Sequence, residues 1–77
     1  MNEYELLEEF SDNLQYFMRE RGINQNQLAK EVGVSRSTIN RYIQLERMPT
    51  LAVLLNIRYI LDCELDDLIP TYEFITL

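Results

Sequence analysis

The sequence predicts an all-α domain, a compact bundle of about five helices. Apolar residues recur at spacings of three and four along most of the chain, which is the period of an amphipathic helix. Residues that favour helix caps precede several of these stretches, and only two glycines and two prolines interrupt the chain. With 77 residues, 47% of them hydrophobic, the chain can form one such domain around one modest core.

The first helix is expected to start between Asn2 and Ser11, because Ser11 is a suitable N-cap for a shorter helix. It ends at "RERG", where arginines occupy the last turn and Gly22 follows as a stop. The apolar stripe of this helix comprises Leu7, Phe10, Leu14, Phe17 and Met18.

The second helix is expected to begin after Asn24, with Gln27 completing a capping box, and to end at Gly33. The third begins after Ser35, so only "GVS" separates the two helices. Such a short link, with glycine in a left-handed turn, makes the helices cross steeply as a helix-turn-helix, and Ala29 allows their close approach. The residues expected in their shared core are Leu28, Val32, Val34, Ile39 and Tyr42.

The fourth helix, "LAVLLNIRYIL", is expected to follow "MPT" with Thr50 as its cap, and it is apolar nearly all round. The residues assigned to the core are Leu51, Leu54, Leu55 and Leu61, whereas Val53, Ile57, Tyr59 and Ile60 need cover from the chain ends or from a second copy. A short fifth helix near "ELDDLI" stops before Pro70. The segment "TYEFITL" is expected to form a short strand or a docked tail.

The formal charge of −6 is unevenly distributed. Residues 22–45 carry Lys30, Arg36 and Arg41 against Glu31 alone, whereas both flanking regions are strongly acidic. A basic element in an acidic chain is suited to approach an anionic partner in one orientation.

Several function classes are disfavoured by composition. The chain has no histidine, one cysteine and no glycine-rich phosphate loop, so we expect neither an enzyme nor a metal or cofactor site. The acid-rich "ELDD" fits a helix start better than a metal site. No apolar run approaches a membrane span, and the acidic start is no secretory signal. A cytoplasmic protein with Cys63 as a buried thiol is expected.

Three segments, "NQNQLAKEVGVSRSTINRYI", "MPT" and "LLNIRYILDCELDDL", resemble the lambda-repressor-like, Cro/CI-type helix-turn-helix family of bacterial and phage transcription regulators. The resemblance extends from about Phe10 to Ile69. It implies a helix-turn-helix DNA-binding domain over residues 10–69, preceded by an acidic helical extension over 1–9 and followed by a tail over 70–77. It also implies operator binding as a homodimer.

The chain departs from this family at three places. Where members often pair a glutamate in the third helix with an arginine in the first, this chain has Ile43 and Met18, which we expect to pack together instead. Leu45 replaces the glycine that usually follows the third helix, which favours a longer third helix and leaves the loop to Pro49 open. Arg58 stands at a usually small position and is expected to extend toward a neighbouring acid.

Within a helix-turn-helix, the start of the second of its helices contacts base edges in the major groove. The residues expected to contact bases are Arg36, Ser37, Asn40 and Arg41, since arginine suits guanine and asparagine suits adenine. The residues expected to contact phosphates are Gln25, Ser35, Gln44 and Arg47. The alternative for the base-contacting set is an ordinary solvated helix face, and the alternative for Gln25 is a favourable residue in the first turn of its helix.

The resulting hypothesis is a sequence-specific regulator that binds a double-stranded DNA operator without a cofactor, as a repressor of phage or mobile-element type. The alternative is a protein-interaction module, either an antitoxin that binds a toxin or an acidic antirepressor, and the net charge of −6 favours it.

Overall fold

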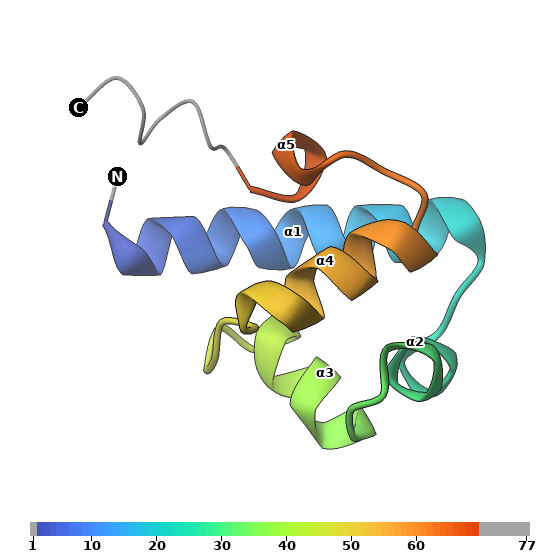
Figure 1. Ribbon diagram of the computed structural model, residues 1–77. Coiled ribbons are helices and arrows are strands. Elements are labelled where there is room, and N and C mark those ends of the chain that lie inside the picture. The colour runs from blue at the N-terminus through green and yellow to red at the C-terminus, as the bar shows by residue number, and fades with distance from the viewer. Residues whose placement is uncertain (1, 70–77) are drawn as a thin grey trace.

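A computed structural model describes residues 2–69, and within this range the chain is entirely helical, without a strand (Figure 1). The helices are α1 (Glu3–Arg21), α2 (Gln25–Val32), α3 (Arg36–Ile43), α4 (Leu51–Ile60) and α5 (Leu65–Leu68). The all-α class with five helices is thereby confirmed. The expected C-terminal strand or docked tail lies outside the described residues.

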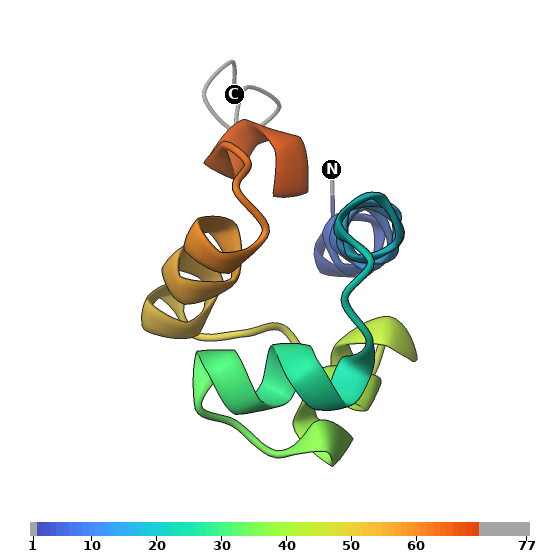
Figure 2. The same cartoon turned by 90° about the vertical axis from the view of Figure 1, so that its right-hand side faces the viewer.

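The helix-turn-helix and α5 lie on opposite sides of the molecule. In both views α2 and α3 occupy one end, α5 occupies the other, and α1 passes between them (Figures 1 and 2). None of the helices within residues 2–69 has the length and hydropathy needed to cross a bilayer.

The first helix starts at the early limit of the expected range. The side chain of Asn2 caps it by accepting a hydrogen bond from the Glu5 N–H at 2.8 Å, and the helix continues without a break past Ser11. The alternative of Ser11 as an N-cap is therefore wrong. Ser11 is buried, and its hydroxyl donates to the Ile43 carbonyl at 2.8 Å, so it fastens α1 to the end of α3.

The caps of the next three helices are confirmed. Asn24 and Gln27 form the reciprocal capping box, with N–O distances of 2.8 and 3.0 Å, and Ser35 and Thr50 cap α3 and α4. Gly33 has φ 87°, a conformation that glycine adopts without steric cost, and it turns the chain sharply from α2 into α3. The steep crossing expected from the short link follows from this turn.

The core is built mainly from α1 and the helix-turn-helix, with the Phe10 ring edge-on to the Tyr42 ring at 6.1 Å. All the residues expected in the shared core of the helix-turn-helix are buried, except that Val34 packs at its margin. The buried apolar residues are Leu7, Phe10, Leu14, Met18, Leu28, Ala29, Val32, Ile39, Tyr42, Leu54, Ile57, Leu61 and Leu68.

The assignment of α4 to the core was partly wrong. Leu51 is 67% exposed and Leu55 is 44% exposed, whereas Ile57 is fully buried. The buried stripe runs through Leu54, Ile57 and Leu61, so the helical period places Leu51 and Leu55 on the opposite side together with Tyr59. Because both faces of α4 are apolar, the sequence pattern alone did not identify the inner one.

The expected extension of the third helix is also wrong, because α3 ends at Ile43. Leu45 takes up the left-handed conformation, with φ 63°, that a glycine usually supplies there. The Leu45 N–H donates to the Tyr42 carbonyl at 3.3 Å and the Glu46 N–H to the Arg41 carbonyl at 2.9 Å, which closes the helix as a Schellman motif. The side chain of Leu45 packs against the core and helps to hold this strained conformation.

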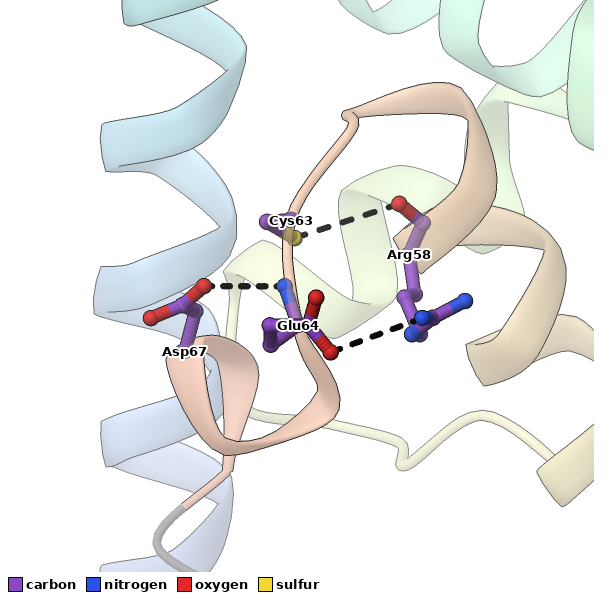
Figure 3. Close-up of polar contacts among 4 residues, drawn as sticks. All are labelled: Arg58, Cys63, Glu64 and Asp67. Atoms are coloured by element: carbon purple, nitrogen blue, oxygen red, sulfur yellow. Dashed lines mark hydrogen bonds and ion pairs between the residues drawn. The ribbon is translucent and has the colours of Figure 1, made fainter.

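Polar contacts fix the junction between α4 and α5 (Figure 3). Arg58 forms the expected ion pair with an acid, Glu64, at 3.5 Å, and the Glu64 N–H donates to Asp67 at 2.8 Å. The acids of "ELDD" thus lie at the N-terminus of α5, as expected. Cys63 is half-buried, and its burial and the neighbouring Asp67 raise the pKa of its thiol, which favours the unreactive protonated form.

Arg21 has a structural role that the sequence did not reveal. Its Nε donates to the Leu61 carbonyl at 2.7 Å and its Nη2 to the Asp62 carbonyl at 3.0 Å, which joins the end of α1 to the end of α4. Asp62 has a left-handed backbone conformation, with φ 50°. The Leu61 carbonyl directly precedes this residue, and the second carbonyl is its own. The guanidinium also lies 5.8 Å from the centre of the Phe17 ring.

We expect Arg21→Gln to lower the free energy of unfolding by about 1–2 kcal/mol, because the two carbonyls lose a charged donor at a partly exposed site. Urea denaturation measures this change. Arg19→Gln is the matched control, since it removes the same charge from the same helical turn without removing a hydrogen bond seen in residues 2–69. Equal destabilisation by the two substitutions would contradict the role of Arg21.

Candidate nucleic-acid interface

The outer face of α3 carries all four residues expected to contact bases. Arg36, Ser37, Asn40 and Arg41 are exposed, while Ile39 on the inner face is fully buried. The first three of them line a surface pocket of about 260 Å³. Within residues 2–69 neither arginine has an ion pair, although the protein has nearly twice as many acids as bases. The face therefore presents two uncompensated cations beside amide and hydroxyl groups.

The start of α3 is held in place by Ser35. Its hydroxyl oxygen accepts from the Thr38 N–H at 3.1 Å and lies 2.9 Å from the Thr38 hydroxyl and 3.0 Å from the Ser37 hydroxyl. Ser35 is exposed, so a phosphate can approach it, but capping α3 is the role that these contacts show. This network also fixes where the face begins.

Gln25 and Asn40 connect the two helices of the motif. Asn40 Nδ2 donates to Gln25 Oε1 at 3.4 Å, from the outer face of α3 to the first residue of α2. The sequence analysis assigns Asn40 to a base contact and Gln25 to a phosphate contact. Their spacing along the chain does not indicate that the two side chains meet. The contact makes the start of α2 and the outer face of α3 one continuous polar surface.

The remaining expected phosphate contacts lie at the far end of α3. Gln44 caps this helix and Arg47 follows in the loop, and both are exposed. Arg47 is close enough to Tyr42 to oppose the rise in the pKa of the Tyr42 hydroxyl that burial causes. Lys30 is exposed on α2.

A second pocket, of about 420 Å³, lies where α1 ends, α2 begins and α3 ends. Met18 and Ile43 line it together, which places the two residues expected to replace an ion pair beside the same space. Its lining consists of Gln15, Met18, Arg19, Gly22, Ile23, Asn24, Gln25 and Ile43. In the described part of the chain, no three acids or cysteines gather in a way that could hold a metal ion.

Comparisons with known proteins agree with this arrangement. Residues 13–73 match the family model of the Cro/C1-type HTH DNA-binding domain. The restriction-modification controller protein C.AhdI from Aeromonas hydrophila superposes with a TM-score of 0.75 at 27% identity, over 80% of this chain and 94% of that protein. An HTH_3 family transcriptional regulator from Vibrio cholerae gives a TM-score of 0.79 at 21% identity.

The Vibrio cholerae regulator is the larger protein, since the match covers 87% of this chain but only 38% of that one. No curated protein sequence gives a significant match. The family model spans most of the five-helix fold and the whole helix-turn-helix, including the polar surface on α2 and α3. The chain therefore belongs to the Cro/C1-type helix-turn-helix DNA-binding family of transcription regulators.

Proposed function

We propose that the protein is a sequence-specific, non-enzymatic regulator that acts in the cytoplasm by occupying a double-stranded DNA operator. The observation that carries this proposal is the outer face of α3, where Arg36 and Arg41 have no acidic partner among residues 2–69 in a protein of charge −6. Arginine donors at the start and middle of such a helix suit guanine edges, and Asn40 suits adenine. Gln25, Gln44 and Arg47 flank this face and suit phosphate oxygens.

The finer proposal is a repressor of phage or mobile-element type that blocks its promoter by occupancy and needs no cofactor. The likeness to a restriction-modification controller protein supports a regulatory role of this general kind. The acidic surface beyond the helix-turn-helix supports it further, because it disfavours binding to DNA in other orientations. Non-specific affinity should then be modest and should fall steeply with salt.

Selection of bound duplexes from random oligonucleotides at low salt tests this function. We expect a defined motif with two related half-sites, because two recognition helices in a dimer reach grooves about 34–36 Å apart. Recovery of no motif would contradict sequence-specific binding. It would favour the alternative of a protein-interaction module, an antitoxin or an acidic antirepressor, for which the net charge of −6 is the supporting observation.

We also propose that the protein acts as a homodimer through the outer face of α4. Leu51, Leu55 and Tyr59 follow one another at intervals of four residues, and Tyr59 is 81% exposed. Three large apolar side chains in one exposed stripe are unusual for the surface of a monomer. The segment 70–77 remains a second candidate for this contact, and it lies outside the described residues.

Leu55→Glu is expected to convert a dimer into monomers, because it places a charge in the middle of the apolar stripe. Sedimentation at micromolar to high micromolar concentration measures the change, and Lys30→Glu on α2 is the control for an added negative charge. Folding should survive, since Leu55 is already 44% exposed. A clean monomer for the unaltered chain over this range would exclude a stable free dimer and leave association on DNA alone.

A further inference from the structure

A groove of about 580 Å³ lies between the start of α1 and the loop that joins α3 to α4. This volume is in the range of clefts that hold a bound group. The lining includes Tyr4, Leu6 and Leu7 from α1, and Arg47 and Met48 from the loop. The residues from α1 precede residues 13–73, so this part of the groove lies outside the match to the family model.

Apolar side chains dominate the lining of this groove, and part of their surface is open to solvent. Tyr4 is 60% exposed, and Leu6 is half-buried without belonging to the core. Met48 is also half-buried, and it packs against the core from the loop. A further apolar segment in the groove would remove these side chains from water, which is favourable.

The segment 70–77 lies outside the described residues, but its sequence has the character that fits this groove. Only one of its eight residues is charged. Its large apolar residues are Tyr72, Phe74, Ile75 and Leu77. Within residues 2–69, both the groove and the outer face of α4 are apolar surfaces that can receive such a segment. The position at which the described chain ends favours the groove.

The end of α5 is fixed against the middle of α1, because the Leu68 carbonyl accepts a hydrogen bond from Asn13 Nδ2 at 3.0 Å. Leu6 precedes Asn13 by two helical turns, so it lies on the same side of α1 and about 10 Å nearer its start. In Figure 1 the described chain ends to the left of α5, toward the N-terminal end of α1. Eight further residues span up to about 26 Å, so they can reach the groove without a change in the described fold.

We propose that this groove is the docking site of the segment 70–77 of the same chain. The apolar side chains of the segment cover Tyr4, Leu6 and Met48, and the outer face of α4 is left to the second copy. The docked segment then braces the loop after α3, which carries Arg47. The proposal goes beyond the proposed function and does not depend on it, since its tests need no DNA.

Disulfide trapping in the full chain tests the contact, with Cys63→Ser to remove the natural thiol. Tyr4→Cys is combined in turn with Tyr72→Cys, Phe74→Cys and Ile75→Cys, and oxidation with diamide is followed by mass analysis of the denatured chains. We expect at least one pair to form a disulfide within a single chain.

Tyr59→Cys in place of Tyr4→Cys is the matched control, because both tyrosines are exposed and only Tyr4 lines the groove. It should form no such disulfide. Linkage between chains, preferred linkage to position 59, or no linkage at position 4 would overturn the proposal.

A second measurement uses no added thiols. Phe74→Ser should lower the urea concentration at the midpoint of unfolding, and most of this shift should be absent when Tyr4→Ser is already present, since the two changes remove the same contact. Folding should survive Tyr4→Ser because Tyr4 is largely exposed. The shift should remain complete in a Tyr59→Ser background. Additive shifts with Tyr4→Ser, or coupling to Tyr59→Ser instead, would show that the segment does not dock in this groove.

Discussion

Ile43→Glu is expected to lower the free energy of unfolding by about 2–4 kcal/mol, because it replaces an apolar side chain packed against the core with a carboxylate in a largely apolar pocket. Ile43 packs against the core at the last position of α3, beside Met18, which is only 7% exposed. The backbone of this residue is fixed as well, since its carbonyl accepts the hydrogen bond of Ser11. Urea or thermal denaturation measures the loss.

The double variant Met18→Arg with Ile43→Glu should recover much of this loss by restoring the ion pair that related proteins often carry. Met18→Arg alone should also destabilise, because it buries an unpaired cation. The two single changes and the double change form a cycle whose coupling energy reports direct interaction. Additive losses would show that the two side chains do not meet, although both line the same pocket.

Arg36→Ala and Arg41→Ala are each expected to weaken binding to the selected operator by about 1–3 kcal/mol and to relax the preference at one base pair. Both side chains lie on the outer face of α3 and neither belongs to the core, so folding should be unaffected. Titration of the operator and of single-base variants measures affinity and preference together. Together the two substitutions should nearly abolish discrimination between operator and random DNA.

Arg47→Ala should behave differently, since a phosphate contact weakens binding to all sequences alike and changes the salt slope by about one. This contrast separates base reading from general attraction between cations and DNA. If Arg36 and Arg41 can both be removed without loss of operator binding, α3 is not the recognition helix. The outer face of α3 would then be better explained as a docking surface for an acidic protein partner.

Local backbone chemistry made most of the fold predictable. Asn24, Ser35 and Thr50 cap their helices as expected, because a side-chain oxygen at these positions satisfies free N–H groups whatever the tertiary structure is. Tertiary contacts account for the errors. Ser11 is a suitable cap by itself, yet its hydroxyl is used by the Ile43 carbonyl, which lies 32 residues away in sequence.

The candidate site was predictable in position and less so in its connections. Helical periodicity placed Arg36, Asn40 and Arg41 on one exposed face, because the buried Ile39 fixes the orientation of α3. The hydrogen bond between Gln25 and Asn40 and the shared pocket of Gln25 and Arg19 depend on how three helices cross. Spacing along the chain carries no signal for such contacts.

Leu45 shows how little a family pattern constrains the end of α3. Its left-handed conformation costs roughly 1–2 kcal/mol relative to glycine, while the partial burial of its side chain returns about 1 kcal/mol that glycine would forgo. Leucine and glycine at position 45 are therefore nearly equivalent for the stability of the fold. Substitution of one by the other is then close to neutral. A sequence search that demands glycine at this position would miss such members, whereas the Schellman hydrogen bonds of the backbone remain the same in both.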